Sequence, residues 1–126
     1  MKRLALLFFT ASMLLAASKI KDAPPVSHVA DAPKTEAKMA VGGRLTVQLP
    51  NPDSSPYEWD LIGMNAKLLT VVAPPKPVPD ANPPAWSVTF QSLRFGRTPV
   101  RFIWSPKGNN KIETPTAMRE VYVTIE

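Results

Sequence analysis

Few residues in this chain could perform acid–base, nucleophilic or metal chemistry. The sequence of 126 residues has no cysteine and a single histidine, His28, which excludes disulfides, thiolate nucleophiles and a three-histidine zinc site. It also lacks a glycine-rich phosphate loop, a Gly-x-Ser-x-Gly turn and a His-Glu-x-x-His pair. Glu58 and Asp60 share a strand face opposite Trp59, and we expect them to be solvated. The residues predict a protein that is not an enzyme and binds no cofactor or metal.

The charge pattern favours a protein partner over a nucleic acid. The chain has 15 basic and 10 acidic residues, and Lys2 and Arg3 contribute part of the net charge of +5. The other lysines and arginines are scattered, with no basic run and no basic stripe interleaved with aromatic residues. We expect binding to another protein and no binding to nucleic acid.

Three loops have a composition suited to binding. Pro50–Pro56 contains three prolines in seven residues, so its shape is largely set and little entropy is lost when it binds. The proline-rich segment Pro74–Pro84 is predicted to be a stiff, extended loop rather than a strand. Ser105–Thr116 is long and polar, with Gly108-Asn109-Asn110 at its expected tip. The alternative is that the prolines only protect sheet edges from unwanted pairing.

The first eighteen residues have the layout of a signal peptide. A positive start is followed by the apolar run Leu4–Ala17 and then by a polar stretch that opens at Ser18. We expect residues 1–18 to direct export, which makes the protein periplasmic, outer-membrane associated or secreted; the alternative is a retained anchor. Leu15-Ala16-Ala17-Ser18 resembles a lipoprotein box with serine in place of the lipidated cysteine. Membrane attachment is therefore expected only through the leader or through an anchor lost at Ser18.

Residues 19–40 are predicted to be a flexible tether. They are rich in proline, alanine and lysine and have no sustained apolar period, so they could not bury enough surface to offset their ordering entropy. The alternative is a short strand or a partner-binding peptide at Val26–Ala30. His28 lies in this segment, and we expect it to be a solvated tether residue rather than a ligand or a catalytic base.

From Val41 to Glu126 the apolar residues alternate, as in half-buried strands. Glycine turns are expected at Gly42-Gly43 and at Gly96, and three tryptophans fall on predicted inward faces. The pattern indicates an all-β, immunoglobulin-like antiparallel β-sandwich in residues 41–126. Its expected strands are Arg44–Leu49, Tyr57–Ile62, Leu68–Val72, Trp86–Phe90, Val100–Trp104 and Val121–Ile125.

The segment Val41–Pro52 is similar to the opening strand and first loop of the chagasin-like inhibitors of papain-type cysteine peptidases. In that family the strand leads into Asn-Pro-Thr-Thr-Gly-Tyr-x-Trp, and here Asn51, Pro52, Tyr57 and Trp59 match, with one extra residue in the loop. Further along, the chain resembles the family's later strands at Phe90–Phe102 and Arg119–Ile125. The resemblance implies an immunoglobulin-like fold whose three loops fill a peptidase cleft as a wedge that offers no cleavable bond.

Two of the three loops depart from the family's motifs. Where the family has Gly-x-Gly-Gly, this chain has Pro79–Pro84, and where it has Arg-Pro-Trp, the nearest match is Trp104–Lys107. The expected partner-binding residues therefore come from the first loop and from the third segment. They are Asn51, Pro52, Asp53, Ser54, Ser55, Pro56, Tyr57, Trp104, Ser105, Pro106 and Lys107.

Two hypotheses of function follow. The first is an exported binding protein that resembles the chagasin-type inhibitors and acts on a cysteine peptidase by loop insertion. The second is a lipoprotein-like structural or adaptor component of a secretion or surface assembly in the envelope. In the second, the tether of residues 19–40 would bind another subunit, and divergent loops would be tolerated.

Overall fold

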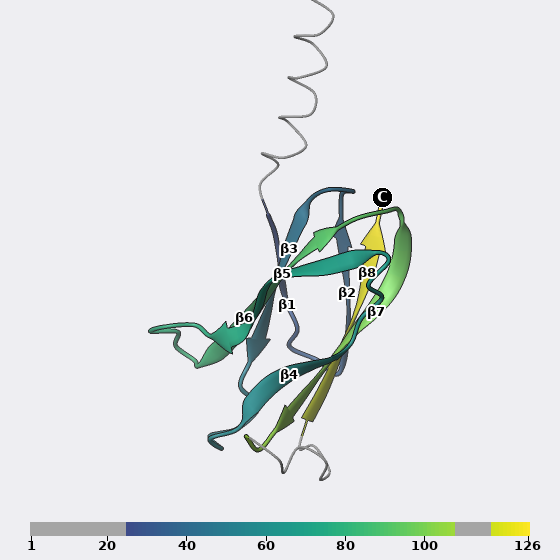
Figure 1. The fold of residues 1–126 in the computed structure, drawn as a ribbon. Coiled ribbons are helices and arrows are strands. Elements are labelled where there is room, and N and C mark those ends of the chain that lie inside the picture. The colour runs from purple at the N-terminus through teal and green to yellow at the C-terminus, as the bar shows by residue number, and fades with distance from the viewer. Residues whose placement is uncertain (1–24, 108–116) are drawn as a thin grey trace, which may run out of the picture.

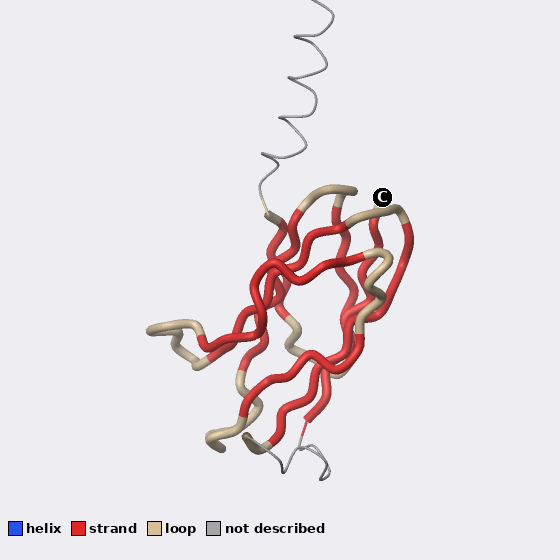
Figure 2. The backbone as a smooth tube through the Cα atoms, viewed as in Figure 1, coloured by secondary structure: helices blue, strands red, loops and turns tan. Residues whose placement is uncertain are grey.

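The computed structural model describes residues 25–107 and 117–126, and every regular element in them is a β-strand (Figure 2). No helix long and apolar enough to cross a membrane occurs in these residues. The strands are β1 (Val26–Val29), β2 (Lys34–Met39), β3 (Arg44–Pro50), β4 (Glu58–Gly63), β5 (Leu69–Pro77), β6 (Ala85–Ser92), β7 (Gly96–Ser105) and β8 (Ala117–Ile125).

The strands form two four-stranded sheets, in the orders β1-β3-β6-β5 and β2-β8-β7-β4, that face each other as a sandwich (Figure 1). The predicted all-β, immunoglobulin-like class is therefore confirmed. The sheets are mixed rather than wholly antiparallel, because β1 runs parallel to β3 and β2 runs parallel to β8. All other strand pairs are antiparallel.

The alternating segments became strands because one of their faces is buried between the sheets. In β3, Leu45, Val47 and Leu49 are buried, while the intervening residues face outward. Each of the six predicted strands overlaps an observed strand, and most observed strands extend a few residues further. The turn expected at Gly42-Gly43 is present, with Gly42 at a φ of 78°, in the left-handed region that favours glycine.

The prediction that Pro74–Pro84 is entirely loop is wrong for its first part. β5 continues through Pro77, with Lys76 and Pro77 opposite Ser87 and Trp86 of β6 and register shifts on the way. β5 is an edge strand and has no neighbouring strand on its outer side. Proline, which has no backbone N–H to donate, is therefore tolerated there. The loop itself is Val78–Pro84.

The prediction of a flexible tether over residues 19–40 is wrong for residues 26–39. β1 and β2 each add an edge strand to a sheet, and Ala37 and Met39 of β2 are buried in the core. Val26–Ala30, named above as the place for a short strand, contains β1. The expected signal peptide, Ser18 and residues 19–24 lie outside the described residues.

The core lies between the sheets and is built around aromatic side chains. Trp59 and Trp104 are each 1 % exposed, and their ring centroids are 5.4 Å apart. Phe90 and Phe102 face each other across the sandwich at 6.3 Å. Trp86, which was also predicted to face inward, is half-buried and packs against the edge of this core.

Side-chain hydrogen bonds connect β1 and the residue after it to the other sheet. His28 Nε2 lies 2.8 Å from Thr35 Oγ1 of β2, and Arg119 Nε donates to the carbonyl oxygen of Ala30 at 3.3 Å. Partial burial lowers the pKa of His28, and the charge of Asp31 opposes this shift. His28 is thus part of the seam between the sheets and not a solvated tether residue.

The strand order places three connections and the end of β7 at one end of the sandwich, which we call the loop end. The connections are β1–β2, β3–β4 and β5–β6. The opposite end holds the start of β1 and the connections β2–β3, β4–β5 and β6–β7. In Figure 1 the loop end is at the bottom, and the β5–β6 hairpin projects sideways from it.

A charge placed in β2 distinguishes a core strand from a tether. Ala37→Glu would bury an unpaired carboxylate, and we expect it to lower the free energy of unfolding by about 3 kcal/mol or more. Lys38→Glu places the same side chain on the exposed face of β2 and should change stability by less than about 0.5 kcal/mol. Chemical denaturation measures both values, and equal stabilities would contradict a structural role for β2.

Candidate functional site

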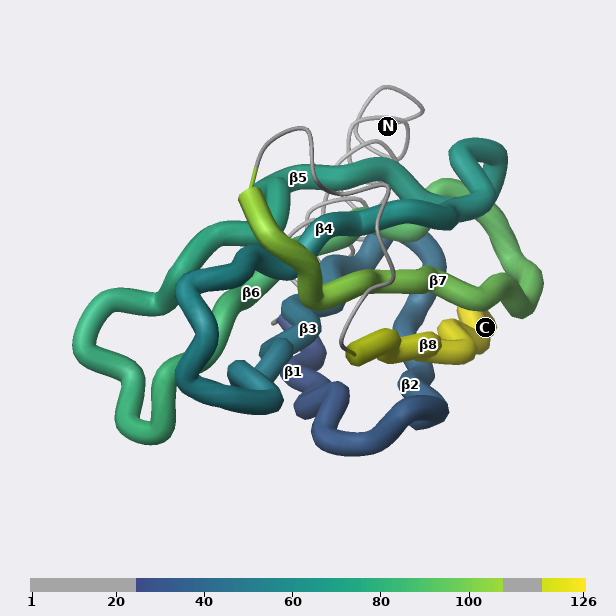
Figure 3. Tube along the Cα trace, turned by 90° about the horizontal axis from the view of Figure 1, so that it is seen from below, coloured from purple at the N-terminus to yellow at the C-terminus, as the bar shows by residue number. Residues whose placement is uncertain are grey.

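The first predicted binding segment is the connection between β3 and β4 at the loop end. Pro50 pairs with Ala85, and Glu58 pairs with Ser105, so the connection runs from one sheet to the other. It therefore lies between the β5–β6 hairpin and the end of β7. Figure 3 shows these connections from the loop end.

The β3–β4 connection is attached to its neighbour on the first sheet through the backbone. Asn51 N donates to the carbonyl oxygen of Pro84 at 3.0 Å. The β5–β6 loop is closed by a bond from Val78 N to Ala85 O at 2.9 Å, and Asp80 within it has a φ of 59°. The structure thus places Val78–Pro84, absent from the predicted contact residues, directly beside Asn51.

A side-chain hydrogen bond attaches the same connection to the second sheet. Trp104 Nε1 donates to Asp53 Oδ1 at 3.1 Å, and Ser55 N donates to the same oxygen at 2.9 Å. Hydrogen bonds from the backbone and side chain of Ser55 lower the pKa of Asp53, desolvation partly opposes them, and the Trp104 indole adds a smaller lowering. Asp53 is therefore the residue that fixes the loop tip to β7.

Aromatic rings form the floor beneath this hydrogen bond. The ring of Tyr57 lies 6.2 Å from that of Trp104, which in turn packs on Trp59. The Arg119 guanidinium lies 5.6 Å from the centre of the Trp59 ring. Tilted aromatic pairs at such spacings contribute about 0.5–1.5 kcal/mol each beyond their buried area, so the loop rests on a rigid base.

Burial divides the predicted contact residues into two groups. Trp104 and Ser105 are buried, so they support the site from below and do not reach its surface. The remaining nine are exposed or half-buried: Asn51, Pro52, Asp53, Ser54, Ser55, Pro56, Tyr57, Pro106 and Lys107. Residues 108–116 of the predicted loop Ser105–Thr116, which include its expected tip, lie outside the described residues.

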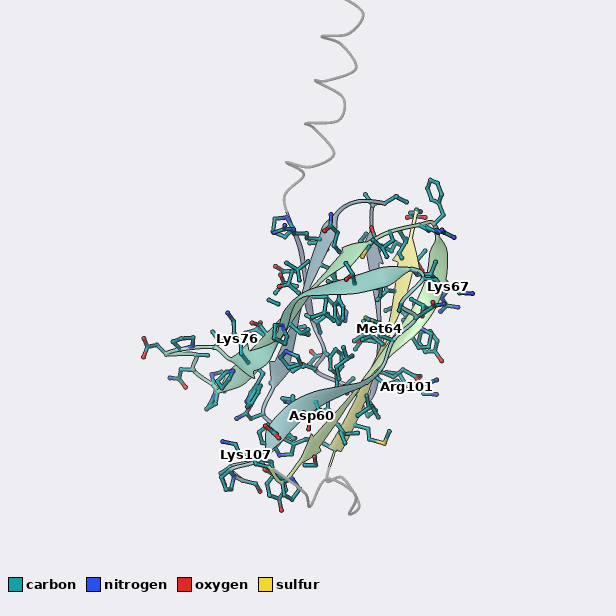
Figure 4. All side chains as sticks on the ribbon, in the orientation of Figure 1. Asp60, Met64, Lys67, Lys76, Arg101 and Lys107 are labelled. Atoms are coloured by element: carbon teal, nitrogen blue, oxygen red, sulfur yellow. The ribbon has the colours of Figure 1, made fainter. Side chains whose placement is uncertain are left out.

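The loop end carries charges of both signs. Asp31, Asp53, Glu58 and Asp80 lie at or near the loop end. Figure 4 labels Lys107 at the loop end and Lys76 on the β5–β6 hairpin that projects from it. Within the described part of the chain, no group of three or more acidic or histidine side chains could hold a metal ion. The loop end thus presents mainly polar, charged and proline side chains at its surface.

Comparison with known proteins places this geometry in a known fold. No family model and no curated protein matches the sequence. Among solved structures, the cysteine protease inhibitor EhICP2 from Entamoeba histolytica is similar with a TM-score of 0.64 and 14 % identity, over 81 % of this chain and 95 % of that one. The chain has the chagasin-like fold.

Two further solved structures share this fold. Amebosin has a TM-score of 0.55 and 15 % identity, over 82 % of this chain and 99 % of its own. PbICP-C, solved in complex with falcipain-2, has a TM-score of 0.54 and 13 % identity, over 81 % and 98 %. At such identities the similarity establishes the fold, and it confirms the resemblance inferred from Val41–Pro52 at that level.

The hydrogen bonds to Asp53 predict an acid-shifted carboxyl. Because its folded-state pKa lies below the ordinary 3.8, Asp53 stabilises the loop above that pH, and this contribution is lost as the pH falls through the lower folded-state value. NMR of the carboxyl carbon should show titration below 3.8. Ser55→Ala removes one of the two Ser55 donors and should raise the pKa part of the way back. Titration at the ordinary value in both proteins would contradict the proposed loop geometry.

Proposed function

We propose that the protein is an exported binding protein of the cysteine peptidase inhibitor type, which inserts its loop end into a peptidase cleft and performs no catalysis. One observation carries the proposal. The Asn51–Tyr57 connection is exposed at its tip and is held in place by the hydrogen bonds of Asp53. It belongs to a domain whose fold is similar to that of a cysteine protease inhibitor. Residues 1–18 are proposed to direct the export.

The loop is suited to act as a wedge because its shape is set before binding. Pro52 and Pro56 restrict the backbone, and the bonds at Asp53 hold the tip against β7. A loop that is ordered in the free protein loses less entropy on association than a mobile one. Exposed Pro52, Ser54 and Pro56 would make the contact, while buried Trp104 keeps them in place.

The neighbouring connections would widen the contact surface on both sides. Val78–Pro84 lies beside Asn51 and presents exposed Asp80, Asn82 and Pro83. Pro106 and Lys107 lie on the other side, after β7. With acidic Asp53 and Asp80 on one side and basic Lys107 on the other, complementarity favours a peptidase whose cleft rim carries charges of both signs.

The alternative function in an envelope assembly has lost part of its support. That hypothesis depended on a tether of residues 19–40 free to bind another subunit, and β1 and β2 occupy residues 26–39 of it. Both strands are paired within the sandwich. The inhibitor hypothesis is therefore the one we retain.

Titration against papain, with residual activity as the readout, tests the proposed function. We expect stoichiometric inhibition, and we expect the double variant Asn51→Ala, Pro52→Ala to raise the inhibition constant by at least about tenfold, or about 1.4 kcal/mol. Its thermal unfolding midpoint should stay nearly unchanged, because both residues lie outside the core.

Arg94→Ala is the matched control, since Arg94 is exposed at the end opposite the loops. It should leave the inhibition constant unchanged. Absence of inhibition at micromolar protein would overturn the proposal for papain-type peptidases, and equal losses in both variants would overturn the assignment of the loop end as the contact surface.

A further inference from the structure

The end opposite the loops carries an exposed apolar and basic tip. In the β6–β7 connection, Phe95 is 74 % exposed, more than any other large hydrophobic residue that the structure describes, and Leu93 is 48 % exposed. Arg94 between them and Lys67 of the adjacent connection are also exposed. We call Lys67, Leu93, Arg94 and Phe95 the Phe95 tip.

The backbone holds this tip in an outward position. Leu93 N donates to the carbonyl oxygen of Leu68 at 2.8 Å, which places the β4–β5 and β6–β7 connections side by side. Ser92 Oγ donates to Ala40 O at 2.6 Å on the other flank. Gly96 follows with a φ of 152°, and a Cβ there would lie 3.0 Å from the Leu68 side chain. The exposure of Phe95 is therefore built into a fixed turn.

Positive charge surrounds the tip. Five basic residues lie at this end, and Arg97 alone among them has a close ion pair in the described residues, with Glu36 at 2.8 Å. The other acidic residue there is Glu126. The five basic residues are Lys38, Arg44, Lys67, Arg94 and Arg97. An apolar tip within a basic surface complements an anionic lipid bilayer.

The chain before the sandwich joins it at this same end. Val26 pairs with Leu45 at the start of β3, beside the β2–β3 turn. The apolar run Leu4–Ala17, with Lys2 and Arg3 before it, precedes Pro25 by about eight residues, which span at most roughly 28 Å when fully extended. A membrane engaged by that run is therefore within reach of the Phe95 tip.

We propose that the Phe95 tip docks on the surface of an anionic lipid membrane. Phe95 and Leu93 would enter the interface while Lys67 and Arg94 contact lipid headgroups. Docking would point the loop end away from the bilayer, toward soluble partners. This inference does not depend on the proposed peptidase inhibition, because it uses other residues at the other end of the sandwich.

The absence of cysteine allows one fluorescent label to be placed at either end. Ala66→Cys, beside the tip, and Ser54→Cys, at the loop end, each carry an environment-sensitive dye on an exposed position of the full chain. Vesicles with about 30 mol % anionic lipid should shift the emission of the Ala66→Cys label to the blue. They should leave the Ser54→Cys label unchanged, and vesicles of neutral lipid should produce a weaker response.

The double variant Leu93→Ser, Phe95→Ser in the Ala66→Cys chain distinguishes membrane binding through the Phe95 tip from binding through the apolar run Leu4–Ala17. It should need at least about tenfold more lipid for half its response, with thermal stability unchanged because both side chains are exposed. An unchanged response would assign binding to the apolar run and overturn the proposal. Equal responses of the two labels would overturn it too. A dimer in sedimentation that the double variant dissociates would instead assign the tip to a second copy of the chain.

Discussion

The packing of Trp104 is the interaction on which both the core and the candidate site depend. Its ring lies between Trp59 and Tyr57, and its indole N–H donates to Asp53 in the connection above. One face of β7 thus fills the sandwich, and the end of the same strand fixes the loop. A change that moved Trp104 would alter core packing and loop shape together, so the loop is as rigid as the core beneath it.

The edge strands β1 and β2 cover backbone groups that would otherwise be unpaired at the edges of the sheets. A sandwich of only the six alternating segments would leave β3 and β8 as edges with unpaired backbone groups. β1 and β2 cover these edges by running parallel to them, and His28 and Arg119 then connect the two sheets across the seam. The opposite edges are β5 and β4, and β5 is protected by prolines that cannot donate to another strand.

The way each strand is buried explains which strands could be predicted from the sequence and which could not. Period two predicted β3, β6, β7 and β8 because each buries one clean apolar face, as Leu45, Val47 and Leu49 do. β2 buries only Ala37 and Met39, and β1 has four residues, so neither gives an apolar period. The proximity of Asn51–Tyr57 to Trp104–Lys107 was predictable through the family resemblance. The bond between Asp53 and Trp104 was not, because 51 residues separate them and only the fold brings them together.

The distribution of charged residues is another feature that is evident only in the folded structure. In the sequence the charged residues after Arg3 are scattered, with no run of lysines or arginines. Folding places Asp53 and Asp80 at the loop end and Arg44, Lys67 and Arg94 at the other, because antiparallel strands return distant segments to the same end. The loop end thus presents charges of both signs on proline-restricted loops, the other end presents basic residues around an apolar tip, and each is suited to a different kind of surface.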